Sequence, residues 1–141
     1  MSEAVAKPLP HPDRDSEPFW RGLREGALCV QRCRGCGALR WPPRAICNRC
    51  RGFDCEWIAL SGRGRIASWV CTHQVFSSAW RDEVPYVVVQ VALDEQDDLQ
   101  LIGRLEGAAP ERGLPVRARF VRVDDAVTFL HWEPVPRAAP E

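Results

Sequence analysis

The chain has 141 residues, 45% of them hydrophobic, and its 19 basic residues balance 19 acidic ones, so its formal net charge is zero. This length accommodates one domain, or two small units that share a core. No apolar run approaches the roughly 20 residues that a membrane span needs. The balanced charge argues against a protein that depends on neutralising nucleic-acid phosphates.

Residues 1–15 are polar, contain three prolines and include no apolar segment of the kind found in signal peptides. We therefore expect a flexible leader on a cytoplasmic protein. The last residues, 137–141, form a short tail after the final predicted strand.

A short helix is predicted over residues 16–27. Ser16 can cap its start, Pro18 fits the first turn, and Gly26 can supply the left-handed residue that ends it. An apolar stripe recurs along this helix at spacings of three to four residues. The stripe either packs on this chain or docks against another subunit; its members are Phe19, Trp20 and Leu23.

The stretch 28–60 contains two Cys-x-x-Cys pairs separated by ten residues, Cys33 with Cys36 and Cys47 with Cys50. In a chain without an export signal, this pattern is typical of a metal site rather than of a disulfide framework. Four thiolates suit zinc or a rubredoxin-type iron. Four protein ligands leave no open position for substrate, so we predict a structural site, with zinc favoured. The other three cysteines are interpreted as ordinary small apolar residues.

From residue 61 to 136 the hydrophobic pattern changes to a period of two, which indicates short β-strands. A slip in the apolar phase between Phe120 and Val121 predicts a β-bulge there, and the acidic run at 94–98 is read as a solvated turn. Five strands in about seventy residues fit a small Greek-key barrel of the OB type. They are expected at 65–73, 86–93, 99–105, 116–123 and 127–132.

The order of these motifs resembles a family of acyl-CoA-associated proteins in which a rubredoxin-like zinc ribbon precedes an OB-fold. The resemblance covers roughly residues 16–134. It rests on the Phe19-Trp20 helix, the two Cys-x-x-Cys pairs with Pro42-Pro43-Arg44 between them, the Leu60-Ser61-Gly62-Arg63-Gly64 joint, and Pro85-Tyr86-Val87-Val88. It implies a mainly β protein with domains at 16–27 (docking helix), 28–60 (zinc ribbon) and 61–136 (OB-fold).

The resemblance further implies a non-catalytic subunit of a heteromeric complex. Members of the family accompany thiolase-fold proteins or hydratases in acyl transfer, thiolysis or aldol cleavage of steroid CoA thioesters. The ribbon and the helix residues Phe19, Trp20 and Leu23 would dock on the partner, and the barrel would help to shelter an acyl-CoA ester. Arg63 is either a solvated surface residue or a contact for the CoA phosphates or the partner.

The residues themselves indicate no catalytic group. His11, His73 and His131 each lie apart in the sequence from an obvious acid or nucleophile. The alternative function is a nucleic-acid-binding ribbon and OB-fold, in which a basic groove and stacking aromatics would hold a single strand. The residues available for that role are Arg63, Arg65, Trp69, Arg104, Arg117, Arg119 and Arg122.

Overall fold

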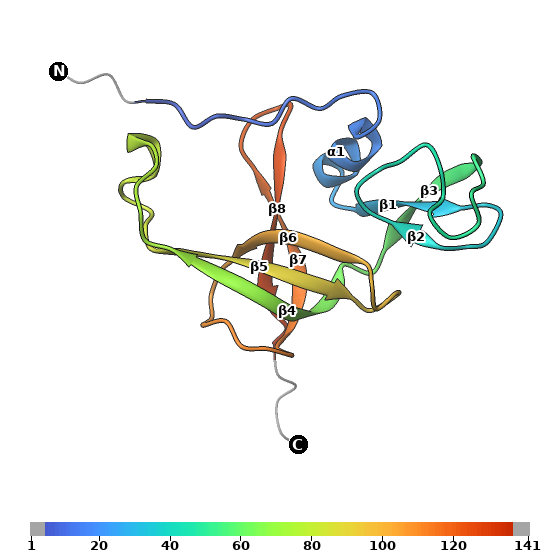
Figure 1. Cartoon of the computed structure of the whole chain (residues 1–141). Coiled ribbons are helices and arrows are strands. Elements are labelled where there is room, and N and C mark those ends of the chain that lie inside the picture. The colour runs from blue at the N-terminus through green and yellow to red at the C-terminus, as the bar shows by residue number, and fades with distance from the viewer. Residues whose placement is uncertain (1–4, 137–141) are drawn as a thin grey trace.

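The computed structural model describes residues 5–136, so residues 1–4 of the predicted leader and the predicted tail at 137–141 lie outside the described residues. Within them, one helix precedes a small sheet and a barrel (Figure 1). The helix α1 spans Glu17–Arg24 and is eight residues long. No helix in the described part of the chain has the length and apolar character to cross a membrane.

The cysteine-rich segment forms a three-stranded antiparallel sheet in the order β2-β1-β3, with β1 at Leu28–Cys33, β2 at Leu39–Arg40 and β3 at Cys55–Leu60. The five strands that follow close into a barrel in the order β4-β5-β6-β8-β7, the arrangement of an OB-fold. A parallel pairing of β6 with β8 completes the barrel. The predicted fold class is therefore confirmed. The barrel strands are β4 (Arg63–Thr72), β5 (Tyr86–Leu93), β6 (Gln100–Leu105), β7 (Pro115–Arg122) and β8 (Thr128–Pro134), with a 3-10 turn, η1, at Ser78–Trp80.

The helix α1 begins and ends close to where the sequence predicts. Ser16 does not cap the helix through its side chain, because its hydroxyl is bonded to Asp13 instead. At the other end Gly26 adopts φ 78° and lets the backbone N–H of Ala27 reach the carbonyl of Gly22 at 2.8 Å. The chain thus turns directly from the helix into β1.

One continuous apolar core joins the helix, the ribbon sheet and the barrel. Phe19 and Leu23 of α1 and Val30 of β1 belong to the same cluster of buried side chains as Val91 and Trp132 of the barrel. The ring of Phe19 also lies 4.1 Å from that of Trp41 in the ribbon. Because no polar layer separates the parts, the ribbon and the barrel are packed as one unit.

The bulge predicted between Phe120 and Val121 is wrong. The pairing of β7 with β8 runs without a shift from Val116 to Arg122, and the irregularity lies instead in β4, between Ile66 and Ser68. Phe120 and Val121 are both apolar because each lines a different cavity, on opposite faces of β7. A strand covered on both faces breaks the simple alternation without any change of register.

Candidate metal centre

The two Cys-x-x-Cys pairs lie at neighbouring turns of the ribbon. Cys33 ends β1 and Cys36 follows in the turn toward β2, while Cys47 and Cys50 occupy the loop before β3. The four sulfurs lie within 4.8 Å of one another, with Cys33 Sγ 3.5 Å from Cys50 Sγ and Cys36 Sγ 3.6 Å from Cys47 Sγ. Tetrahedral zinc bound at about 2.3 Å needs sulfurs about 3.8 Å apart, so these side chains fit the metal.

Backbone N–H groups point at the sulfurs and favour their charged forms. The N–H groups of Cys50 and Arg49 lower the pKa of Cys47 to about 6, and those of Cys36 and Gly35 contribute to a lowered pKa at Cys33. At Cys50 the Gly52 N–H acts in the same direction, but the neighbouring sulfurs and burial together outweigh it and raise the pKa to about 11. All four sulfurs can therefore be ionised together only when a bound cation offsets their mutual repulsion.

The remaining cysteines stand outside this cluster. Cys55 faces Cys33 across the β1–β3 pair, Cys29 is half-buried beside Gly22, and Cys71 is exposed on β4. Burial raises the pKa of Cys29, which keeps it a neutral thiol.

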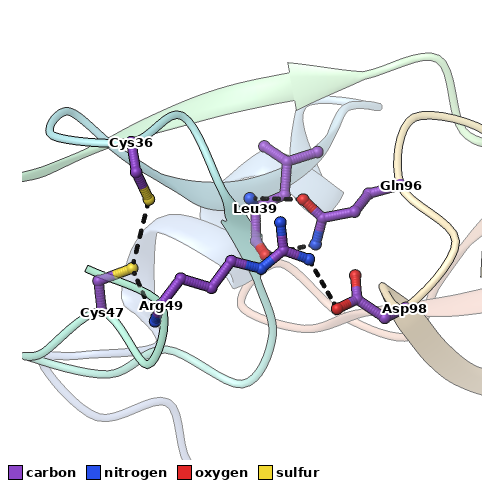
Figure 2. Close-up of polar contacts among 6 residues, drawn as sticks. All are labelled: Cys36, Leu39, Cys47, Arg49, Gln96 and Asp98. Atoms are coloured by element: carbon purple, nitrogen blue, oxygen red, sulfur yellow. Dashed lines mark hydrogen bonds and ion pairs between the residues drawn. The ribbon is translucent and has the colours of Figure 1, made fainter. Parts of the chain in front are cut away.

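The acidic turn at 94–98 fastens the ribbon to the barrel, and is not merely solvated as the sequence suggests. The side-chain amide of Gln96 receives a hydrogen bond from the Leu39 N–H at 2.9 Å and donates one to the Leu39 carbonyl at 2.7 Å (Figure 2). Asp98 accepts from Arg49, in the second cysteine turn, at 2.8 Å (Figure 2). The Gln96 side chain thus pairs with both backbone groups of Leu39 at the edge of β2, as the backbone of a neighbouring strand would.

Replacing Gln96 by alanine is expected to cost about 1–3 kcal/mol of unfolding free energy, since it removes two hydrogen bonds and leaves a part-buried backbone group without its partner. Chemical denaturation followed by tryptophan fluorescence measures this loss, and hydrogen exchange at the Leu39 amide should accelerate. Gln74→Ala, at an exposed position on the β4–β5 loop, is the matched control. Equal stability of the two variants would contradict the fastening role.

The helix residues proposed for docking are not equally accessible. Phe19 and Leu23 are only 5% and 1% exposed, because they pack into the chain's own core. Trp20 is half-buried and stands over a groove of about 200 Å³ between α1, Ile102 and Phe129. The buried pair can therefore shape this groove, and Trp20 is the member of the stripe whose side chain is partly exposed.

Arg63 is exposed at the start of β4 and lines a cavity of about 260 Å³ at the joint between ribbon and barrel. Arg117 lines the same cavity, but its guanidinium donates to Glu133 at 2.8 Å. No ion pair is found for Arg63 within residues 5–136. Its flanking glycines are needed: Gly62 has φ 76°, and a Cβ on Gly64 would stand 2.4 Å from the Ala92 carbonyl oxygen.

The structure brings together one pair of titratable groups that the sequence does not indicate. His131 of β8 lies with Nδ1 3.3 Å from an oxygen of Glu106, although 25 positions separate them in the chain. The parallel β6–β8 pairing, which places Arg104 opposite His131, brings them together. The pKa of His131 is lowered, chiefly by burial, so its imidazole is neutral at pH 7.

A four-cysteine ribbon joined to an OB barrel defines a class of small zinc-containing proteins. Residues 20–56 match the family model described as the ChsH2 rubredoxin-like zinc ribbon domain, and residues 57–121 match the model of the ChsH2 C-terminal OB-fold domain. The cofactor is accordingly structural zinc. The chain belongs to the DUF35 family, to which a scaffold protein of Methanocaldococcus jannaschii also belongs; that relative is 32% identical over 75% of this chain and 77% of its own length.

Longer relatives share the same module. The chain is 31% identical to a probable enoyl-CoA hydratase alpha subunit of Thermomonospora curvata, over 91% of this chain and 40% of that protein. It is 33% identical to the 3-oxo-4,17-pregnadiene-20-carboxyl-CoA hydratase alpha subunit of Mycobacterium tuberculosis, over 89% and 39%. The chain thus spans about two fifths of the length of these proteins.

Two solved structures share the fold. A chain of the Ltp2-ChsH2(DUF35) aldolase superposes with a TM-score of 0.79 at 32% identity, over 89% of this chain and 98% of that chain. A DUF35 protein of Sulfolobus solfataricus, described as of unknown function, has a TM-score of 0.60 at 15% identity over 86% of each chain, and supports the fold alone.

Proposed function

We propose that this chain is an accessory subunit of an acyl-CoA-processing complex, without a catalytic site of its own, and that it docks on a larger thiolase-fold or hydratase partner. The observation that carries the proposal is the match to nearly the whole ChsH2 chain of a two-protein aldolase. The partner would perform acyl transfer, thiolysis or retro-aldol cleavage, with a steroid side-chain CoA ester as one candidate substrate.

The metal centre supports a scaffolding role. Cys33, Cys36, Cys47 and Cys50 would fill all four positions of a tetrahedral zinc ion, so the metal would stabilise the fold and not bind substrate. Because the cysteine cluster lies beside β2 and the turn at 94–98, the metal would also hold the ribbon in place against the barrel. Trp20 and the groove beside it would form part of the docking surface.

Arginine pairing weakens the alternative function in nucleic-acid binding. Several of the arginines available for a phosphate groove already face carboxylates of the same chain. Binding a polyanion would require these pairs to separate, and the formal net charge of zero supplies no general attraction. The pairs are Arg104–Glu83, Arg117–Glu133, Arg119–Glu106 and Arg122–Asp125.

The proposal is tested by producing the zinc-loaded chain alone and together with a thiolase-fold protein from the same organism. We expect co-elution at a defined stoichiometry in size-exclusion chromatography with light scattering. CoA-ester turnover should require the partner and be absent from the chain alone. Robust turnover by the isolated chain, or separate elution with unchanged partner kinetics, would refute the proposal.

Arg63 is proposed to contact the CoA phosphates, or an acidic partner residue beside them, from the cavity at the joint. Losing one charged hydrogen bond costs about 1.5–3 kcal/mol, or about ten- to hundredfold in affinity. Arg63→Ala should therefore raise the KM of the complex for CoA esters by about that factor, with zinc content unchanged. Arg112→Ala, at an exposed turn, is the control. A KM and a partner affinity within about twofold of wild type would leave Arg63 a surface arginine.

A further inference from the structure

A second cavity lies on the outer face of the barrel, under the leader. It measures about 460 Å³, and residues Lys7, Pro8 and Leu9 line it together with barrel strands. Figure 1 shows this segment as the blue trace that passes over the barrel toward α1. Tyr86 of β5 and Phe129 of β8 belong to its walls. The size falls within the range of small-molecule sites.

The walls of this cavity are mainly apolar. Trp80 of η1, Val88 of β5 and Val121 of β7 line it with Tyr86 and Phe129. These side chains project from the outer face of a barrel whose interior is already filled by residues such as Val89, Leu105 and Trp132. A pocket lined by aromatic and aliphatic groups on an outer sheet face favours an apolar ligand over water.

Two basic and two acidic side chains line this cavity, and both basic ones converge on a single carboxylate, that of Glu83. The Arg104 guanidinium donates to Glu83 at 2.7 Å, and Lys7 forms an ion pair with the other oxygen of the same carboxylate. Two cations thus share one anion. Both contacts keep the pKa of Glu83 low, with Lys7 contributing most, so the carboxylate is ionised at pH 7.

The second carboxylate of the lining, Glu106, is compensated from outside the cavity. It pairs with Arg119, which is not a lining residue, at 3.0 Å, and His131 beside it is neutral. His131 Nδ1 is buried without a well-aligned hydrogen bond, although it faces Glu106. The cluster formed by Lys7, Arg104 and Glu83 therefore retains one uncompensated positive charge next to an apolar wall.

We propose that this cavity binds an amphipathic anion, with an apolar body of about ten carbon atoms against the aromatic wall and one carboxylate between Lys7 and Arg104. The leader forms the roof and supplies one of the two cations. The site belongs to this chain alone and needs no partner, so it goes beyond the proposed scaffold function and stands or falls separately from it.

Isothermal titration of the zinc-loaded full chain with four ten-carbon probes that differ in their head group tests this site. Decanoate should bind saturably with one molecule per chain. Decanol should bind at least tenfold more weakly, and decyltrimethylammonium should not bind, because the cluster of Lys7, Arg104 and Glu83 has a net positive charge. Decyl phosphate reports whether the site accepts any anionic head or selects a carboxylate; failure of both anions would overturn the proposal.

Variants of the leader locate the site without disturbing the core. Lys7→Ala should weaken decanoate binding about tenfold, whereas Arg14→Ala, an exposed leader arginine, should bind like wild type. Amide chemical shifts on titration should move at Lys7, at Leu9 and at the non-proline residues of 80–88. Equal binding of decanoate, decanol and decyltrimethylammonium, an unchanged or higher affinity in Lys7→Ala, or shifts confined to other surfaces would each overturn the assignment.

Discussion

Cys36→Ser is expected to leave the chain without zinc and without a folded ribbon. Cys36 is exposed, so its thiol contributes little to packing and its loss acts through the metal. Structural zinc sites contribute several kcal/mol of folding free energy, about 10–16 kcal/mol in zinc-finger peptides. A loss of even part of that amount equals the whole stability of many domains. Most of the variant should therefore be insoluble, or unable to assemble with a partner.

Metal analysis and denaturation measure the two halves of this prediction. Wild type should contain one zinc per chain, and chelation should reproduce the behaviour of the variant. Cys71→Ser, which removes an exposed thiol of β4 outside the cluster, should keep its zinc and its stability. A soluble Cys36→Ser protein with normal zinc content would show that another group holds the metal.

Trp132→Ala is expected to have the largest effect of any substitution in the barrel. Its side chain is 0% exposed, and β8, which carries it, lies between β6 and β7 in the closed barrel. The indole ring packs against Gly103 of β6. A Cβ added to this glycine would lie 2.9 Å from the ring. Replacing a fully buried aromatic side chain by alanine costs about 3–5 kcal/mol.

Equilibrium unfolding in urea, followed by far-ultraviolet circular dichroism, measures this loss. Trp69→Ala is the matched control, because Trp69 lies on β4 and is 40% exposed; its cost should remain below about 1 kcal/mol. Similar midpoints for the two variants would mean that the barrel interior relaxes around the missing ring. The zinc content of both should stay at the wild-type value, since neither side chain touches the cysteine cluster.

Features governed by local pattern were predictable from the sequence. Period-two alternation, together with a nearly continuous apolar run at 86–93, located all five barrel strands to within two residues at each end, and the paired cysteines predicted the cluster that the structure forms. Gly26 as the end of the helix follows from the same kind of local rule. In each case the residues that determine the feature lie within a few positions of one another, so local backbone geometry is enough to predict it.

Features that depend on strands far apart in the chain were not predictable. The pairing of β1 with β3, Gln96 at the edge of β2, and the approach of Glu106 to His131 each join segments separated by 20 or more positions. Nothing in a solvated-looking acidic run distinguishes Gln96 from its neighbours. The side-chain amide acquires its role only after the barrel closes and brings the turn to Leu39.

The continuous core has a consequence for how this module is inherited. The border between the two family models, at residues 56 and 57, falls inside β3, which spans Cys55–Leu60. Recombination at this border would build β3 from two different parent sequences. It would also combine core side chains of the helix, ribbon and barrel that do not fit one another. Exchange between relatives should therefore succeed when residues 17–134 move as a single block, which suits a module that occurs both as a short chain and inside longer proteins.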